Sequence, residues 1–148
     1  MITFESPAQS LTYRLKALNK IADKMSSELS RDKLGLPYPE ASVIAVVGTY
    51  GPQTIMEISR RANLDKSQAS RTIEALLAKE MLTSGENDQD GRSVIISLTA
   101  AGKKTYKKIR PTMEKRDQNL FGCLLDPELD ALRYLLDKVL TAQGWEDA

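Results

Sequence analysis

The chain has 148 residues, of which 41% are hydrophobic and 28% charged, and its net charge is +1. This composition is typical of one globular domain or of two closely merged halves. Histidine is absent and Cys123 is the single cysteine, which removes the usual general base, the commonest metal ligand and any intramolecular disulfide. We therefore expect no cofactor and no metal, and the common routes to an enzyme are missing.

The N-terminus and the apolar runs bear on location. The first ten residues, MITFESPAQS, lack the cationic and apolar pattern of a signal peptide. The longest apolar run, near residues 41–47, is too short to cross a bilayer. A cytoplasmic protein with no membrane partner is the resulting expectation.

The charges are unevenly distributed along the chain. Residues 54–110 hold 11 Lys/Arg and 7 Asp/Glu, a balance of +4, and the remainder has a balance of −3. A near-neutral total that contains a basic segment fits a protein that presents one face to phosphates, although solvated helix faces would give a similar pattern.

Two helices are predicted in the first third of the chain. Apolar residues recur every three or four positions from Leu11 to Leu29, which predicts a long helix over residues 8–32 with one apolar stripe. Such a stripe favours a helical partner. Gly35 and Pro37 then break the pattern. A second helix, over residues 39–50, is apolar on several sides and is expected to be buried through Val43, Ile44, Val46 and Val47.

A helix-turn-helix is predicted next. Thr54 and Glu57 have the spacing of a capping box at the start of a short helix, and Asp65 and Gln68 repeat that spacing at the start of another. In this second helix the apolar side chains are expected to point inward: Ala69, Ile73, Leu76 and Leu77. The remaining side chains face outward and are polar or charged: Lys66, Ser67, Ser70, Arg71 and Glu74.

A β-hairpin follows the helix-turn-helix. Residues 81–85 and 93–98 are predicted as its strands, because Val94, Ile96 and Leu98 alternate with residues of the opposite face. The polar loop between the strands, GENDQDGR, is expected to form an exposed tip.

Two helices complete the chain. Thr99 is expected to cap a long helix, in which Pro111 should produce a kink or a short break. Asp126 and Pro127 mark the start of the last helix. Between the two, Cys123 is expected to be a buried, small apolar side chain and not a peroxide sensor. Because the terminal helices carry more apolar surface than a small domain can cover, two copies are expected to pair through them.

In this order, the motifs resemble the MarR family of winged helix-turn-helix transcriptional regulators, most closely from Leu36 to Tyr106. The resemblance lies in LPYPEASVIAVVGTYGPQTIMEISRRANLDKSQASRTIEALLAKEMLTSGENDQDGR and in SVIISLTAAGK. The wing pattern of the family is aspartate, any residue and arginine, followed by leucine-threonine and a glycine. Here it appears as Asp90, Arg92, Leu98, Thr99 and Gly102.

The resemblance implies a mainly α fold with an α+β wing. Residues 36–102 would form the winged helix-turn-helix DNA-binding region, and residues 1–35 and 103–148 a helical dimerisation region. It also implies a homodimer on double-stranded DNA, in which the helix of residues 66–79 enters the major groove. Family members commonly repress genes and release DNA when a small phenolic or apolar molecule binds, so a ligand-responsive repressor is expected.

The outward side chains of the second helix of the motif are the first candidate DNA contacts. Arg71 has the group that most often reads guanine, and Lys66 supplies a point charge for phosphate. Ser67 and Ser70 can bond to base edges or phosphates. Gln68 has two alternatives, since it can complete the capping box of the helix or read a base.

Candidate contacts also lie outside that helix. Arg92 in the wing suits a narrow, electronegative minor groove, and Asp90 can hold its guanidinium in place. Thr54 can present its hydroxyl and a helix N-terminus to a phosphate, or can simply cap the helix. Arg60 and Arg61 are phosphate contacts or surface charges, and the pattern does not choose between these roles.

A pocket for a small aromatic or apolar effector is expected near the first two helices. Its candidate residues are Tyr13, Arg14, Tyr38 and Tyr50, with Arg14 as the partner of a carboxylate; the alternative is that they are core aromatics and a surface arginine. The cationic cluster of residues 103–110 is interpreted as a solvated face or as an interface with acidic segments.

The sequence therefore predicts a homodimeric, DNA-binding transcriptional regulator, a ligand-responsive repressor that recognises a pseudo-palindromic duplex. The alternative is a winged-helix protein-interaction module without DNA binding. That alternative predicts apolar residues on the outward face of the helix of residues 66–79, where the chain has polar and cationic ones.

Overall fold

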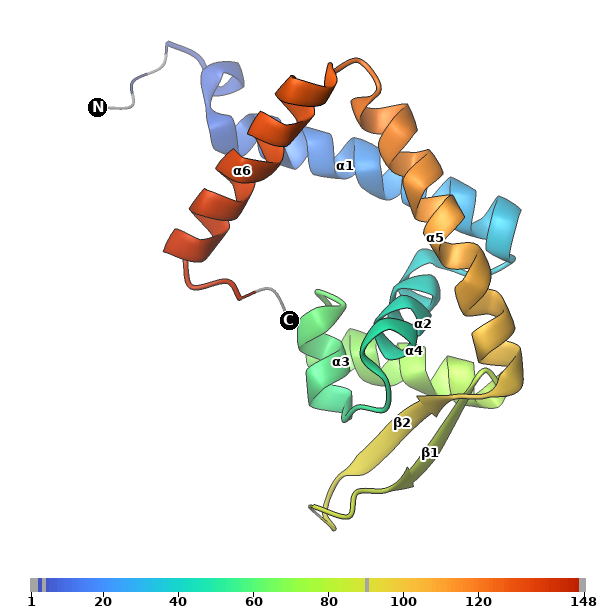
Figure 1. Cartoon of the computed structure of the whole chain (residues 1–148). Helices are drawn as coiled ribbons and strands as arrows, with labels where there is room; N and C mark the ends of the chain where they lie inside the picture. Colours follow the sequence, from blue (N-terminus) through green and yellow to red (C-terminus); the bar gives the residue numbers. More distant parts are fainter. Residues whose placement is uncertain (1–2, 4, 90, 147–148) are drawn as a thin grey trace. The chain divides into compact units, whose positions relative to one another are not determined.

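The computed structural model describes residue 3 and residues 5–89 and 91–146. Helices predominate and one hairpin forms the only sheet of this described part, so the expected mainly α fold with a wing is confirmed (Figure 1). The elements in chain order are η1 (Pro7–Gln9), α1 (Leu11–Leu29), η2 (Ser30–Leu34), α2 (Tyr38–Tyr50), α3 (Ile55–Arg61), α4 (Lys66–Ala78), β1 (Leu82–Glu86), β2 (Val94–Leu98), α5 (Ala100–Phe121) and α6 (Asp126–Ala142).

The internal contacts divide the chain into two compact units, Met1–Arg116 and Asp117–Ala148. The first unit contains the helix-turn-helix, the wing and most of α5, and the second contains the end of α5 and all of α6. The expected division into a DNA-binding region and a dimerisation region concerns function and assembly, and it stays a prediction.

The core of the first unit is built around α2. Val43 and Ile44 of this helix are fully enclosed, and Val46 and Val47 are buried as well. α2 packs against α3, α4 and β2, and Ile58, Ile73, Leu76 and Ile96 of these elements complete the apolar cluster. Burying each such side chain contributes about 1.5–3 kcal/mol. The prediction that α2 is buried on several sides is therefore confirmed.

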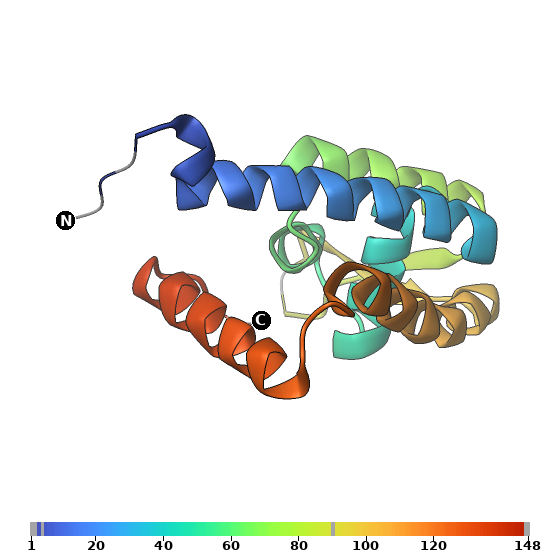
Figure 2. The same ribbon diagram turned by 90° about the horizontal axis from the view of Figure 1, so that it is seen from above.

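The first helix runs as one long rod from α1 into η2, as both ribbon views show (Figures 1 and 2). Its last turns are π-helical and end at Gly35, which has a left-handed φ of 66°. Ser30 is buried there and donates its hydroxyl to the Leu36 carbonyl at 2.7 Å. In contrast, Leu11 and Leu15, at the other end of the stripe, are 67% and 53% exposed.

The wing is an antiparallel hairpin that extends away from the helices (Figure 1). Leu82 pairs with Leu98 at its base, and Glu86 pairs with Val94 toward its tip. Of the three side chains that alternate with the opposite face of β2, Ile96 is buried and Leu98 half-buried, but Val94 is exposed. The alternation therefore coincides with burial near the base of the wing and not at Val94, which lies near the tip, beyond the core cluster that covers Ile96.

α5 begins as predicted. The Thr99 hydroxyl accepts the N–H of Gly102 at 3.1 Å and donates to the Glu80 carbonyl at 2.6 Å, which joins α5 to the end of α4. The helix continues through Pro111 without a break, so of the two predicted outcomes the break is not found and the kink stays a prediction. Proline removes one backbone donor, and next to it the Thr112 hydroxyl donates to the Lys108 carbonyl at 2.8 Å.

In the second unit, Asp126 and Pro127 start α6 as predicted, and Glu128 accepts the backbone N–H of Leu125 at 2.8 Å. Cys123 is exposed, so the expectation of a buried thiol is wrong for the single chain. It lies in the turn after α5, outside both helices. Several large apolar side chains of this unit are also exposed: Leu125, Tyr134, Leu135, Leu136, Val139, Leu140 and Trp145. Among the described residues, no helix is long and apolar enough to cross a membrane.

Gly48 of α2 allows α5 to approach closely. A Cβ atom at this position would collide with the ring of Tyr106, whose hydroxyl shares a hydrogen bond of 3.2 Å with Thr49. Alanine normally favours a helix over glycine, but here the ring would have to move and the α2–α5 packing with it.

We therefore predict that Gly48→Ala lowers the free energy of unfolding by ~1–3 kcal/mol, as overpacked cores do. Gly85→Ala is the matched control, because a Cβ at Gly85 meets open space, and it should change the stability by less than ~0.5 kcal/mol. Urea denaturation followed by circular dichroism measures both. Equal stability of the two variants would show that Tyr106 does not restrict this position.

Candidate nucleic-acid interface

The helix-turn-helix begins with a complete capping box at α3. The Thr54 hydroxyl accepts the N–H of Glu57 at 3.3 Å, and the Glu57 carboxylate accepts the N–H of Thr54 at 2.8 Å. The same carboxylate accepts the Thr54 hydroxyl at 3.1 Å. Capping is therefore the role that the structure gives to Thr54, and a phosphate contact through the exposed helix N-terminus remains a prediction.

The second capping box fixes the start of α4. Asp65 Oδ1 accepts the N–H of Gln68 at 2.8 Å, and Gln68 Oε1 accepts the N–H of Asp65 at 3.1 Å. The capping alternative for Gln68 is thus realised in the structure. Its amide nitrogen is not used by the box, so Gln68 still has a donor to offer to an acceptor outside the chain.

The two faces of α4 differ sharply. Ala69, Thr72, Ile73 and Leu76 are buried, and Thr72 donates its hydroxyl to the Gln68 carbonyl at 2.7 Å. On the other face Lys66, Ser67, Gln68, Arg71 and Glu74 are exposed and Ser70 is half-buried. The division of side chains between the faces agrees with the sequence pattern.

An ion pair anchors the C-terminal end of α4. Lys79, the residue after the helix, donates to Glu40 at 2.6 Å, and the Glu40 side chain is only 9% exposed. Glu40 lies in the first turn of α2, 39 residues away in sequence. The capping box therefore defines where α4 begins, and this ion pair ties its C-terminal end to α2.

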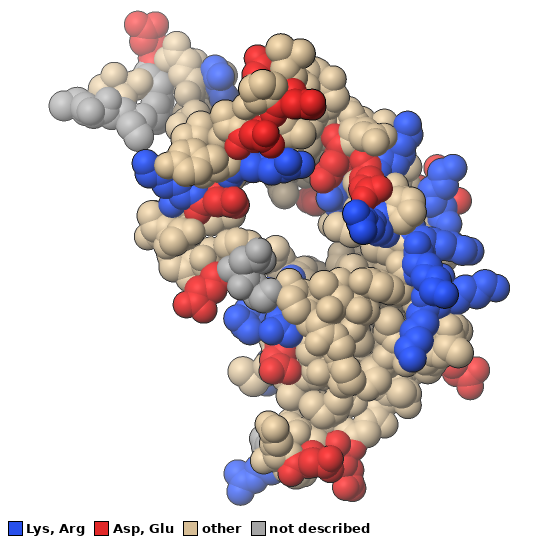
Figure 3. Space-filling view, viewed as in Figure 1, with Lys and Arg blue, Asp and Glu red and all other residues tan. Residues whose placement is uncertain are grey.

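The wing tip is a short polar loop. Asn87 donates to the Ser93 hydroxyl at 2.9 Å and accepts the N–H of Gln89 at 3.1 Å, which ties the two sides of the loop together. Arg92 is exposed in this loop. Acidic and basic side chains meet at this end of the wing (Figure 3), because Glu86 and Asp88 are exposed there as well. Asp90, the predicted brace of Arg92, lies outside the described residues.

The cationic cluster on α5 is exposed, and Figure 3 shows basic side chains along this helix. Lys103, Lys104, Lys107 and Lys108 face solvent, and Arg110 pairs with Glu114 at 2.8 Å. This bond is the main reason that the pKa of Arg110 lies above its ordinary value. The structure thus agrees with the interpretation of a solvated face.

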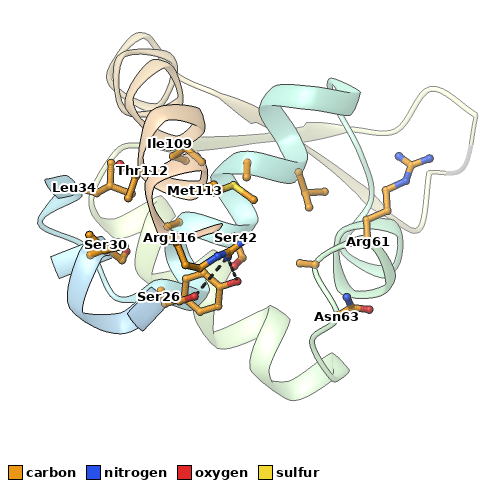
Figure 4. Close-up of a pocket in the computed structure, with 16 residues that line it drawn as sticks. Ser26, Ser30, Leu34, Ser42, Arg61, Asn63, Ile109, Thr112, Met113 and Arg116 are labelled. Atoms are coloured by element: carbon orange, nitrogen blue, oxygen red, sulfur yellow. Dashed lines mark hydrogen bonds between the residues drawn. The ribbon is translucent and has the colours of Figure 1, made fainter. Parts of the chain in front are cut away.

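A cavity of about 240 Å³ lies within the first unit, between α1, α2, the end of α3 and α5 (Figure 4). Arg116 of α5 donates to the Tyr38 hydroxyl at 3.3 Å and to the Ser26 hydroxyl at 3.4 Å on one side of it. The other walls are largely apolar. Its lining residues include Ser26, Tyr38, Arg61, Asn63 and Arg116.

The structure does not bring the four expected effector residues together. Tyr38 lines the cavity, but Tyr13 lies beside a separate surface hollow near the N-terminus. Arg14 donates to the Ala8 carbonyl at 3.0 Å, and Tyr50 lies under the guanidinium of Arg61. Sequence reasoning missed Arg116, because its two partners are 78 and 90 residues away and no local pattern connects them.

Residues 34–93 match the model of the MarR family. The winged-helix region is therefore similar to the proteins of the MarR family. The expected resemblance is confirmed, and the family is one of transcriptional regulators with a DNA-binding fold. Among curated proteins, the chain is 26% identical over 121 residues to the uncharacterized HTH-type transcriptional regulator YpoP of Bacillus subtilis. This match covers 82% of this chain and 81% of YpoP.

Solved MarR-type structures share the fold. A variant of MarR from E. coli in complex with operator DNA has a TM-score of 0.78 and 24% identity, and the match covers 88% of this chain and 93% of that one. BpsR of Bordetella bronchiseptica, whose DNA binding is regulated by 6-hydroxynicotinic acid, has a TM-score of 0.83 and 21% identity, with 93% and 97% covered. At these identities the likeness establishes the fold.

The capping box of α3 makes stability depend on pH. The backbone hydrogen bond from Thr54 is the main reason that the pKa of Glu57 lies below its ordinary 4.5. The unfolded chain therefore takes up this proton more readily than the folded chain does. The stabilisation is complete above pH 4.5 and is lost as the pH falls through the lower, folded-state pKa.

We predict that Glu57→Gln reduces the acid sensitivity of the free energy of unfolding, because one group that binds protons on unfolding has been removed. The wild type should lose more stability than the variant between about pH 5 and pH 3, so the two pH profiles should differ in slope only in that range. Urea denaturation from pH 7 to pH 3 measures it, with Glu74→Gln, on the outer face of α4, as the control. If both variants keep the acid profile of the wild type, the Thr54 contact does not stabilise the carboxylate.

Proposed function

We propose that the protein is a homodimeric, sequence-specific regulator that binds pseudo-palindromic duplex DNA through α4 and the wing. The observation on which this rests is the outer face of α4. It carries Lys66, Ser67 and Arg71 as exposed side chains, on a helix whose start is defined by a capping box and whose end is tied to α2 by an ion pair. A rigid helix with short polar and cationic side chains fits the major groove, where each base pair presents a distinct pattern of donors and acceptors.

The wing supplies the second contact of the proposal. Arg92 would enter the minor groove that flanks the major groove occupied by α4, because narrow minor grooves attract an arginine side chain. Lys66 would bind a phosphate, Ser67 and Ser70 phosphates or base edges, and Arg71 a guanine. Gln68 would use the amide nitrogen that its capping box leaves available.

The exposed apolar side chains support a homodimer. Leu11, Leu15 and Ile21 of α1 are each more than half exposed, as are Tyr134 and Val139 of α6. Apolar helical faces of this kind are normally covered in solution by another copy or another protein. Two copies would place two α4 helices about one DNA turn apart, roughly 10 base pairs between half-sites.

The cavity supports a ligand-responsive repressor. Arg61 and Asn63 of its wall lie four and two residues before Asp65, which caps α4. A small aromatic acid that fills the cavity would contact the segment that orients α4, and its carboxylate would pair with Arg116 instead of the expected Arg14. The regulation of BpsR by 6-hydroxynicotinic acid supports this class of effector.

The rival function, a winged-helix module that binds only protein, requires an apolar outer face on α4. The exposed residues of that face are polar or charged instead. This observation favours DNA over a protein partner.

We predict that Arg92→Ala weakens binding to the DNA upstream of the protein's own gene by about 10- to 100-fold without changing the oligomeric state. Loss of the minor-groove contact is the reason. Band-shift titrations measure the affinity, and analytical ultracentrifugation measures the assembly. Arg31→Ala, which removes an exposed cation from η2, is the matched control and should bind almost as the wild type does.

If the wild type does not bind this DNA in preference to an unrelated duplex, the proposed function is wrong. Equal affinities of Arg92→Ala and Arg31→Ala would remove the wing contact alone and leave α4 as the reading element.

For the effector, we predict that 6-hydroxynicotinic acid at millimolar concentration releases DNA from the wild type. Arg116→Met should raise the concentration of acid needed for release by about tenfold or more, because a charge-assisted hydrogen bond to the carboxylate is lost. Arg14→Met is the control, because Arg14 lies away from the cavity. Titration of the acid against a preformed DNA complex measures the effect. If Arg116→Met still responds to the acid and Arg14→Met does not, Arg14 is the partner of the carboxylate, as the sequence predicted.

A further inference from the structure

Gln53, in the turn between α2 and α3, is a buried polar residue that contacts the wing. Only 2% of it is exposed. Its backbone N–H donates to the Ile96 carbonyl at 3.1 Å, and its carbonyl accepts the N–H of Ile96 at 2.7 Å. Ile96 also pairs with Ser84 of β1. β2 is therefore held in its middle from both sides, by β1 on one edge and by Gln53 on the other.

The side chain of Gln53 is fixed by three bonds. Its amide nitrogen donates to the Val46 carbonyl at 3.3 Å and to the Gly51 carbonyl at 3.0 Å, near the end of α2. Its amide oxygen accepts Nη1 of Arg61 at 2.6 Å. A buried amide oxygen that lost this donor would bear the full cost of its desolvation, so the orientation of Gln53 depends on Arg61.

Arg61, at the end of α3, is itself held in place. Its guanidinium lies 4.3 Å from the centre of the Tyr50 ring, a cation–π contact. Its buried Nε atom has no hydrogen-bond partner among the described residues. Burial of this donor without a partner costs free energy, and the contacts of the Arg61 guanidinium with Gln53 and Tyr50 offset that cost. Figure 4 shows the Arg61 guanidinium directed away from Arg116, on the far side of the cavity.

We propose that Arg61 is a positioning residue for the wing and that it acts through Gln53. The contacts run in one line from the last residue of α3, through the buried Gln53, to the middle of β2. The importance of the wing for DNA binding rests on the proposed function. Because Arg61 also lines the cavity, the cavity wall and this support of the wing share one side chain.

Amide hydrogen exchange tests the positioning without DNA. In Arg61→Met, which keeps an apolar stem but no donor, exchange at the Ile96 amide should become about tenfold faster. The amides of Ile73 and Leu76 in α4 should stay within about twofold. Arg60→Met is the matched control, since Arg60 is an exposed neighbour on the same helix, and it should leave Ile96 unchanged. Unchanged exchange at Ile96 in Arg61→Met overturns the proposal, and so does an equal acceleration at all three amides.

Arg61→Lys keeps the charge and provides a second variant should Arg61→Met fold poorly. A lysine cannot place a planar fork between Gln53 and Tyr50, so Ile96 should still exchange faster than in the wild type. If Arg61→Lys protects Ile96 as well as the wild type does, the contact with Gln53 is not the cause and the proposal fails.

A double-mutant cycle in DNA affinity connects the positioning to function. Arg61→Met should weaken binding by about tenfold more than Arg60→Met does, and this excess should largely disappear in an Arg92→Ala background, because both changes would then act on the same wing contact. Full additivity with Arg92→Ala overturns the route through the wing. If Arg92→Ala alone leaves DNA affinity unchanged, the wing contact of the proposed function fails, and exchange at Ile96 still decides whether Arg61 positions β2.

Discussion

The burial of α2 is the constraint on which the rest of the first unit depends. This helix has apolar side chains on several sides, and Val43 and Ile44 are fully enclosed by neighbouring elements. Such a helix is stable in water only if other elements cover it. α3, α4 and β2 pack against it, and Gly48 allows the ring of Tyr106 in α5 to lie against its last turns. The positions of the proposed reading elements therefore follow from the need to cover α2.

Polar contacts then set the orientation of these elements, which hydrophobic packing alone leaves less defined. The capping box of Asp65 and Gln68 determines where α4 begins, and the Lys79–Glu40 ion pair ties its end to α2. Gln53 performs the corresponding task for β2. The Glu40 and Gln53 side chains are buried, so a displacement of α4 or β2 would leave these polar groups unpaired. The result is a helix and a hairpin held in a fixed relation, as a surface that reads DNA requires.

The features that the sequence predicted correctly are local ones. A capping box needs two residues three positions apart, and the inward face of α4 follows from a periodicity of three to four residues, so both can be recognised without knowledge of the fold. The exposed outer face of α4 was predicted in the same way. The start of α6 at Asp126 and Pro127 is a further example.

The features that the sequence did not reveal depend on residues far apart in the chain. Glu40 and Lys79 are separated by 39 residues, and Arg116 lies 78 residues from Tyr38. The effector candidates chosen by residue type therefore scattered, and only Tyr38 lines the cavity. Cys123 was assigned to a buried position because its neighbours are apolar, but the turn after α5 leaves it exposed in the single chain.

Footprinting with dimethyl sulfate and hydroxyl radicals on the DNA upstream of the protein's own gene tests the central claim most directly. Dimethyl sulfate methylates guanine N7 and so reports coverage of the major groove, whereas hydroxyl radicals attack the deoxyribose and report coverage of the minor groove. The account predicts a two-fold symmetric footprint with two protected major-groove segments about one helical turn apart, each flanked by a protected minor-groove segment. A single asymmetric footprint, or protection confined to the major groove, would contradict joint reading by α4 and the wing of two copies.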